Sequence, residues 1–225
     1  MKSCIKGLML CLLGFVLMLG GGRTASAAPC PGTTTLDVLV GLPAAGCTIQ
    51  DKIFSGFTTN LVDPENVNAT LIFQQLGTQD QHGWTFSKDP GFTSSFTLSY
   101  TIAVDTANFP TVTIFAAKDQ IFDGLNPYDV SVADTQTGVP SGALGVLNVD
   151  GTLAANETEQ LVYGSAQTSV TTSSVVTIAA GEQLASYEQN WFEQGSSIPE
   201  PGTLFLLGTG LVGLAGVAWR RNRKS

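Results

Sequence analysis

The sequence predicts an all-β protein whose central domain, residues 28–194, is an antiparallel β-sandwich of the jelly-roll-like or Ig-like kind. Three observations lead to this fold class. One segment alternates between apolar and polar residues, other short runs are rich in Thr, Val, Ile and Phe, and Gly, Pro, Asn and Asp clusters separate the runs. No stretch of the domain has the period of an amphipathic helix, so we expect no crossover helices. A closed barrel is the alternative.

The clearest strand signal is residues 92–104. Its even-numbered positions hold mostly large apolar side chains, and its odd-numbered positions hold only Thr, Ser and Ala. Successive side chains of a strand point to opposite faces of the sheet. We therefore predict one continuous strand with a single apolar face, made of Phe92, Phe96, Leu98, Tyr100, Ile102 and Val104.

The remaining strands are predicted from shorter runs that are rich in β-branched and aromatic residues. After Ala180 the chain becomes polar, and residues 195–198 are predicted to be a flexible linker. The predicted strands are Leu36–Val40, Thr48–Phe57, Ala69–Leu76, Trp84–Phe86, Thr111–Ala116, Tyr128–Ala133, Ala143–Val149, Glu159–Tyr163 and Ser169–Ala179.

Charge is unevenly distributed along the chain, which has a formal net charge of −8. Residues 28–198 contain 17 of the 18 acidic residues but only Lys52, Lys88 and Lys118, a local net charge of −14. A protein that binds nucleic acid through its backbone needs clustered Lys and Arg to neutralise phosphates. The sequence therefore excludes nucleic acid as a general partner.

The N-terminus has the pattern of a secretory signal peptide, residues 1–27. Lys2 and Lys6 precede the apolar run 8–19, and Ala25-Ser26-Ala27 supplies the small residues that signal peptidase requires. We predict cleavage between Ala27 and Ala28, after export through the Sec translocon. An uncleaved membrane anchor is the alternative.

The C-terminus carries a second apolar segment. Residues 203–219 contain no charge and are just long enough for one transmembrane helix. The basic tail 220–225 follows at once, and such clusters stay on the cytoplasmic side of the membrane. The residues that orient the helix are Arg220, Arg221, Arg223 and Lys224. The central domain is therefore expected outside the inner membrane.

The tripeptide Pro199-Glu200-Pro201 stands directly before this apolar segment, and its two prolines hold the chain extended. Together with the helix and the basic tail it resembles the PEP-CTERM sorting signal. The resemblance covers residues 199–225 and implies recognition by exosortase, a membrane-embedded cysteine protease of polysaccharide-producing Gram-negative bacteria. It implies a single-pass inner-membrane intermediate that is cleaved near the tripeptide and passed to the cell surface or secreted.

Cleavage of the signal peptide leaves Cys30 and Cys47 as the only cysteines of the exported chain. The periplasm is oxidising, so we predict a disulfide between them. A reactive cysteine is the alternative, with His82 as its only available imidazole partner. Two cysteines are too few for a structural zinc site.

A second resemblance lies at residues 46–57. Similar Asp-Lys-x-Phe-Ser-x-Phe stretches occur near the mature N-terminus of many PEP-CTERM proteins whose β domains are uncharacterised. The segment reads as a strand with Ile53 and Phe57 on one face and Phe54 on the other. We interpret it as core packing, and it indicates kinship of fold without indicating an activity.

The candidate chemical groups of the domain are few. His82, the only histidine, lies in a polar stretch that we interpret as a surface turn, without a Gly-x-Ser-x-Gly nucleophile motif. Four oxygen-bearing side chains in an acidic loop could bind calcium, which accepts irregular geometry, although their spacing is not that of an EF-hand. These are Asp119, Asp123, Asn126 and Asp129. Nothing selects a carboxylate pair for glycoside hydrolysis.

The function we predict is that of a non-enzymatic surface or extracellular-matrix protein, structural or adhesive in an exopolysaccharide or biofilm matrix. Its expected partners are exosortase, signal peptidase, the Sec translocon, exopolysaccharide and, transiently, the inner membrane. No cofactor is expected apart from the calcium noted above. The alternatives are a secreted carbohydrate-active enzyme and a calcium-dependent carbohydrate-binding module.

Overall fold

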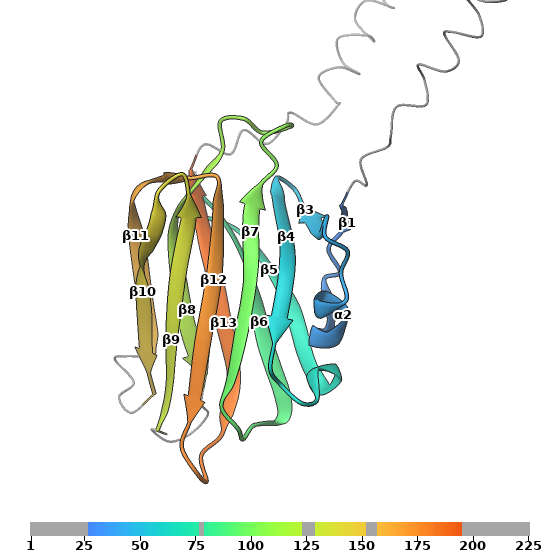
Figure 1. Cartoon of the computed structure of the whole chain (residues 1–225), viewed down its shortest axis with the longest axis vertical. Coiled ribbons are helices and arrows are strands. Elements are labelled where there is room, and N and C mark those ends of the chain that lie inside the picture. The colour runs from blue at the N-terminus through green and yellow to red at the C-terminus, as the bar shows by residue number, and fades with distance from the viewer. Residues whose placement is uncertain (1–26, 77–78, 123–128, 152–156, 195–225) are drawn as a thin grey trace, which may run out of the picture.

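The structure of the protein is a computed structural model that describes residues 27–76, 79–122, 129–151 and 157–194 (Figure 1). Strands dominate these residues, with one short α-helix and one turn of 3-10 helix. The elements are β1 (Ala28–Pro29), β2 (Thr33–Thr35), α2 (Leu36–Val40), β3 (Cys47–Ile49), β4 (Lys52–Thr59), η1 (Pro64–Asn66), β5 (Val67–Leu76), β6 (Gln79–Phe92), β7 (Phe96–Val104), β8 (Thr113–Phe122), β9 (Val130–Val139), β10 (Gly142–Asp150), β11 (Thr158–Gln167), β12 (Ser169–Ile178) and β13 (Leu184–Gln194).

The strands form two sheets that lie face to face (Figure 1). The seven-stranded sheet has the order β1-β3-β4-β7-β12-β9-β10, and the six-stranded sheet has the order β11-β8-β13-β6-β5-β2. The pairing of β1 with β3 is parallel, and the other described pairs are antiparallel. The predicted fold class, an antiparallel β-sandwich, is confirmed.

The core lies between the sheets and follows the predicted alternation. On β7 the even-numbered side chains from Phe96 to Val104 are buried, and the odd-numbered ones reach the outer surface. At the centre, Tyr100 packs against Phe57 with a ring-centroid separation of 4.6 Å and against Trp191 at 5.3 Å. Such aromatic burial supplies much of the hydrophobic stabilisation of a sandwich core.

The continuous strand predicted over residues 92–104 is wrong in one respect. The chain turns between Phe92, where β6 ends, and Phe96, where β7 begins, so the two phenylalanines belong to different sheets. Their rings nevertheless meet across the core at 4.8 Å. The short predicted strand Trp84–Phe86 is the middle of β6.

The predicted strand Leu36–Val40 is also wrong, because these residues form helix α2. Periodicity cannot distinguish a five-residue apolar run in a strand from one in a helix. In the helix, Leu36 and Leu39 share one buried face, while Val38 remains 47% exposed.

The segment predicted as one strand over Thr48–Phe57 is a hairpin. Strand β3 ends at Ile49, Gln50 takes a left-handed conformation with φ 51°, and β4 begins at Lys52. A bulge at Gly56, with φ 66°, shifts the register between Ser55 and Thr58. The predicted opposite facing of Phe54 and Phe57 is therefore wrong, because the extra residue turns both rings into the core.

The polar stretch after Ala180 contains a strand that we did not predict. Strand β13 pairs with β6 on one side and β8 on the other, so it is central in its sheet. The predicted linker, the tripeptide 199–201, the helix 203–219 and the basic tail 220–225 lie outside the described residues, as does most of the signal peptide. Among the described residues no helix is long and apolar enough to cross a membrane.

Candidate functional site

The predicted processing and disulfide residues lie at the start of the described chain. Ala27 is half-buried, and Ala28 opens strand β1 with an exposed side chain. Cys30 and Cys47 form the predicted disulfide. It joins the segment after β1 to β3, which leads directly into the turn that carries Asp51.

The four residues predicted to bind calcium are not all in one loop. Asp119 lies in strand β8 and is buried, which corrects its assignment to an acidic loop, whereas Asp129 is exposed just before β9. Asp123 and Asn126 lie outside the described residues. Calcium binding by this set stays a prediction. Asp119 is buried and would not be available to it as an exposed ligand.

His82 contradicts the prediction of a surface histidine. Its side chain is 0% exposed, because residues 79–92 form the long central strand β6 and His82 points inward from it. The exposed ring of Phe73 on β5 covers the imidazole, with ring centroids 5.1 Å apart. The polar residues around His82 suggested a turn, but here they continue a strand.

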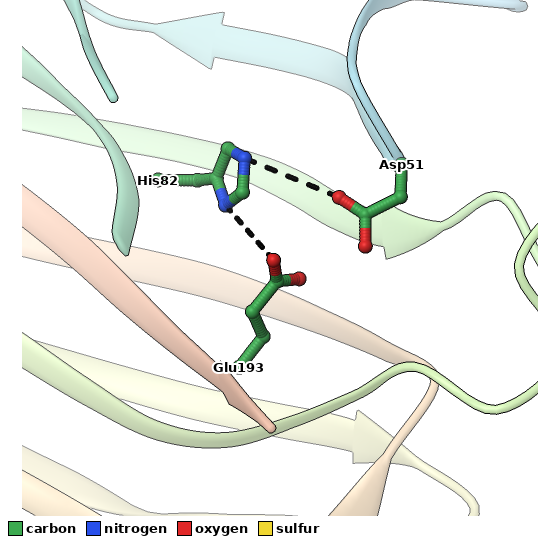
Figure 2. A group of neighbouring side chains, drawn as sticks. All are labelled: Asp51, His82 and Glu193. Atoms are coloured by element: carbon green, nitrogen blue, oxygen red, sulfur yellow. Dashed lines mark ion pairs between the residues drawn. The ribbon is translucent and has the colours of Figure 1, made fainter. Parts of the chain in front are cut away.

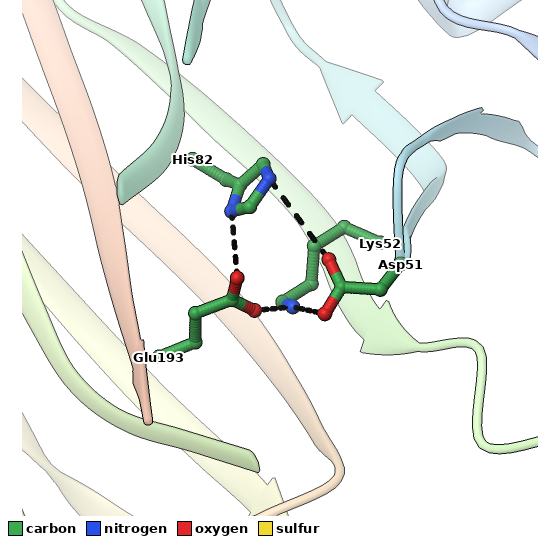
Figure 3. A network of polar contacts seen from close by, with 4 residues as sticks. All are labelled: Asp51, Lys52, His82 and Glu193. Carbon is green, nitrogen blue, oxygen red and sulfur yellow. Dashed lines mark ion pairs between the residues drawn. The ribbon is translucent and has the colours of Figure 1, made fainter. Parts of the chain in front are cut away.

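Four buried ionisable side chains lie close together, and we call them the charged cluster: Asp51, Lys52, His82 and Glu193 (Figure 3). They come from the β3–β4 turn, β4, β6 and β13, and therefore from both sheets. Each is 4% exposed or less. Their burial is costly, because desolvating a charge is unfavourable unless it is paired and hydrogen-bonded.

The contacts of the cluster form a closed ring. Lys52 Nζ lies 2.8 Å from Asp51 Oδ2 and directly contacts Glu193 Oε2. His82 Nε2 lies 4.0 Å from Asp51 Oδ1, and His82 Nδ1 lies 3.8 Å from Glu193 Oε1 (Figure 2). The two imidazole distances are too long for hydrogen bonds. The Lys52 ammonium is therefore the only close partner that either carboxylate has within the cluster.

An aromatic layer lies beneath the charged cluster. Phe54, Trp84 and Trp191 each follow or precede a cluster residue by two positions on the same strand, so they point into the core beside it. The Phe54 ring lies 5.7 Å from Trp84 and 6.4 Å from Trp191. These rings close the cluster from the core side and exclude water there.

Burial shifts the pKa values of both basic groups. Burial lowers the pKa of the Lys52 ammonium, and the nearby carboxylates of Asp51 and Asp80 only partly offset the effect. The pKa of His82 falls to about 4, first through burial and then through the positive charge of Lys52. His82 is therefore neutral at neutral pH, and Lys52 gives up its proton more easily than an exposed lysine.

The cluster contains the ligand types of a metal centre but not an open position. One ligand atom each from Asp51, His82 and Glu193 lies within 4.8 Å of the others. The Lys52 ammonium, however, already lies between the two carboxylates (Figure 3). The carboxylates also face opposite nitrogens of the imidazole (Figure 2). An entering dication would have to displace a cation that belongs to the chain.

A second buried polar group, which we call the aspartate network, is formed by residues of β8, β9, β11, β12 and β13. Asp134 accepts hydrogen bonds from the Thr172 hydroxyl, from Ser174 Oγ at 3.0 Å and from Gln136 Nε2 at 2.7 Å. Tyr187 Oη donates to Asp119 Oδ2 at 3.0 Å. The members are Asp119, Asp134, Gln136, Tyr163, Thr172, Ser174, Tyr187 and Gln189.

The two carboxyls of the aspartate network both ionise less readily than exposed aspartates. Burial raises the pKa of Asp119 well above its usual range, and the negative charge of Asp134 raises it further. Burial also raises the pKa of Asp134, but the hydrogen bonds that it accepts oppose this rise. The upward shift of the pKa is therefore the less opposed one at Asp119, which holds its proton more firmly than an exposed aspartate does.

Part of these sites has a recognisable signal in the sequence. Lys52 is one of only three lysines between residues 28 and 198, and the apolar residues Ile53 and Phe54 follow it directly. Glu193 and Gln189 lie in a polar stretch of the sequence, which does not suggest a buried strand. Only their alternation with Trp191 indicates one. Asp134, Thr172 and Ser174 occupy inward positions that a polar-outside pattern assigns to the surface.

Comparison with known proteins identifies one feature of the chain. The model of the PEP-CTERM protein-sorting motif matches residues 197–224. The chain carries a PEP-CTERM sorting signal. This confirms the resemblance of the C-terminal segment, and the signal indicates export and exosortase-mediated sorting to the cell surface.

Solved structures that match the chain include carbohydrate-binding modules. A family 61 module in complex with β-1,4-galactotriose has a TM-score of 0.34 and 9% identity, over 62% of this chain and 88% of that chain. The CBM22-1 xylan-binding domain of Xyn10C from Paenibacillus barcinonensis has a TM-score of 0.28 and 12% identity, over 76% and 97% of the two chains. No curated protein matches the chain.

Proposed function

We propose that this protein is a structural or adhesive component of the exopolysaccharide or biofilm matrix at the cell surface and has no enzymatic role. The observation that carries the proposal is the sorting signal at residues 197–224, because exosortase delivers its substrates outside the cell. In this proposal the Sec translocon, signal peptidase and the inner membrane are transient partners, and exopolysaccharide is the lasting one.

The outer face of the seven-stranded sheet supports an adhesive role. Its central strands carry many hydroxyl side chains, and Thr101, Thr171 and Thr137 lie side by side in register. The hydroxyls of Thr101 and Thr171 lie 2.8 Å apart. We call this surface the hydroxyl face, and it comprises Thr97, Ser99, Thr101, Thr135, Thr137, Thr171, Ser173 and Thr177. Uncharged hydroxyls can exchange hydrogen bonds with a polysaccharide without electrostatic repulsion from an acidic polymer.

The position of the single histidine supports the non-enzymatic role. A Ser-His-Asp hydrolase needs an imidazole within hydrogen-bond reach of both its nucleophile and an incoming substrate. His82 is the only histidine of the chain, and it is enclosed between strands and aromatic rings. Chemistry at the surface therefore has no histidine base.

The sorting part of the proposal is tested by replacing Pro199, Glu200 and Pro201 with alanine in the native host. The altered protein should accumulate in the membrane fraction with its basic tail attached, whereas the natural chain should reach the matrix without it. A matched control replaces Gly195 and Ser196, which precede the matched signal, with alanine and should sort normally. Equal delivery of the tripeptide variant and the natural chain would contradict exosortase sorting.

The adhesive part is tested by pull-down of the surface protein with the host's own exopolysaccharide. Thr135→Glu places a charge on the hydroxyl face, and Val162→Glu places the same charge on exposed strand β11 of the other sheet. We expect the first variant to lose most of its retention and the second to keep it. Equal retention of both, or shortening of the polysaccharide by the natural protein, would contradict the proposal.

A further inference from the structure

Lys52 and Glu193 are in direct contact across the interior of the sandwich. Lys52 belongs to β4 of the seven-stranded sheet, and Glu193 belongs to β13, the last strand of the six-stranded sheet. Lys52 Nζ contacts Glu193 Oε2, and each side chain is 1% exposed. A buried amine and a buried carboxyl are thereby held together, with a second carboxylate, Asp51, 2.8 Å from the same nitrogen.

We propose that Lys52 and Glu193 form an intramolecular amide bond, with Asp51 as the group that transfers protons during its formation. The bond would join Lys52 Nζ to Glu193 Cδ. It is a covalent modification of the chain by its own residues and needs no cofactor.

The hydrogen-bonding state of the cluster favours this outcome over a permanent ion pair. Asp51 lies at hydrogen-bond distance from Lys52 Nζ, but among the described residues neither buried carboxylate oxygen of Glu193 has a hydrogen-bond partner besides the Lys52 ammonium. A buried ion pair offsets its desolvation cost only when hydrogen bonds satisfy the remaining donors and acceptors. Amide formation removes both charges from the core.

The reaction balances without an added reagent. The Lys52 ammonium passes one proton to the Glu193 carboxylate, which gives a neutral amine and a carboxylic acid. The amine nitrogen forms a bond to Glu193 Cδ, and the Asp51 carboxylate takes the second proton from nitrogen. Asp51 then gives this proton to the departing hydroxyl, the C–O bond breaks, and one water leaves.

The protein around Lys52 and Glu193 favours this reaction in three ways: it makes the amine available, excludes water and holds the partners in contact. Burial lowers the pKa of Lys52, which makes the neutral nucleophile more available. The Phe54 and Trp191 rings lie two residues from the reacting groups and exclude the water that would reverse the reaction. The fold fixes the partners in contact, which replaces a bimolecular encounter by an oriented one.

The bond would close a large loop and would lie close to the sorting signal. It joins residues 52 and 193, which are 141 positions apart, and Glu193 stands shortly before the sorting signal that begins at residue 197. The end of the domain that leads to the sorting signal would be tied to the opposite sheet. A domain outside the cell gains persistence from a cross-link that reduction cannot break.

The experiment is mass spectrometry of the full chain after export, reduction and denaturation. The natural chain should weigh one water, about 18 Da, less than its processed sequence. Trypsin should fail to cut after Lys52, because an acylated lysine is no longer its substrate. Fragmentation should locate residues 52 and 193 in one branched peptide.

Three variants separate this bond from other losses of water. Lys52→Met should have its full sequence mass, whereas the matched control Lys118→Met should keep the loss. Glu193→Gln should lose ammonia, about 17 Da, instead of water, which a succinimide elsewhere in the chain cannot reproduce. Asp51→Ala keeps both reacting groups and should leave most of the chain unlinked.

The outcomes decide the proposal even when a variant folds poorly, because the natural chain and Glu193→Gln carry the decisive masses. A natural chain of full sequence mass that trypsin cuts after Lys52 would overturn it. A loss of water that persists in Lys52→Met would also overturn it. An equal yield of linked chain in Asp51→Ala would remove Asp51 from the mechanism.

Discussion

The charged cluster and the aspartate network are two buried polar regions of one sandwich, and their charged groups have different partners. In the aspartate network the carboxylate of Asp134 accepts three side-chain hydrogen bonds, and Tyr187 reaches Asp119. In the charged cluster the Lys52 ammonium is the close partner of both carboxylates, Asp51 and Glu193, and no hydroxyl or amide group donates to either among the described residues.

The difference suggests different roles. Hydroxyl and amide groups donate to Asp134, and this hydrogen-bonded centre of the aspartate network stabilises one packing arrangement, although Asp119 Oδ1 and Gln189 Oε1 have no hydrogen-bond partner among the described residues. The charged cluster brings opposite charges into contact without surrounding hydroxyl or amide donors. We therefore assign a structural role to the aspartate network and a reactive one to the charged cluster.

The largest effect is expected from removing the centre of the aspartate network. Asp134→Ala leaves the donors of Thr172, Ser174 and Gln136 without their acceptor, which should lower the free energy of unfolding by about 3–5 kcal/mol. Asp134→Asn keeps one acceptor oxygen and should cost less. Denaturant titration measures both values, and equal losses would show that the hydrogen bonds to Asp134 are not what stabilises this region.

The next effect comes from the disulfide beside the charged cluster. Its loop spans 17 residues, so replacing Cys30 and Cys47 with alanine should cost about 3 kcal/mol on the chain-entropy model. Denaturant titration of the double variant, compared with the reduced natural chain, checks the value. Unchanged stability in both would mean that the cross-link does not constrain the unfolded chain.

The charged cluster should weaken the fold in acid. The folded-state pKa of His82, about 4, lies below the ordinary value of 6.5, so stability is complete above pH 6.5 and falls as the pH drops toward 4. The full loss is about 3 kcal/mol. His82→Gln should flatten this part of the stability–pH curve, and an unchanged slope would locate the acid sensitivity elsewhere.

The aspartate network should show the opposite dependence on pH. The pKa of Asp119 is raised in the folded state, so its contribution is complete below the ordinary carboxyl pKa and is lost as the pH rises through the folded value. Asp119→Asn cannot ionise and should remove this decline. Chemical unfolding of both proteins from acidic to alkaline pH makes the comparison, and parallel curves would contradict the raised pKa of Asp119.

The smallest effect is expected from one hydroxyl. Tyr187→Phe removes hydrogen bonds to Asp119 and Ser174 but keeps the ring, which should cost about 1–3 kcal/mol. The variant also tests whether the network acts as a unit. In a double-mutant cycle with Asp134→Asn, additive losses would show that the two positions are independent.

The sandwich class could be predicted because strands such as β7 have one apolar and one polar face. Strand β13 could not, because its inward positions include Gln189 and Glu193 as well as Trp191. Polar residues at inward positions also prevented prediction of the candidate sites. His82 and Asp119 stand among polar residues, and only the pairing of strands distant in sequence places them in the interior.

The most direct test of the account is the intact mass of the protein recovered from the outer surface of its native host. We predict a chain that begins at Ala28 and ends near Pro199, and whose reduced mass is one water below its sequence mass. A chain that still carries Arg220 to Lys224 would contradict exosortase sorting. A chain with the predicted ends but its full sequence mass would contradict the Lys52–Glu193 bond alone.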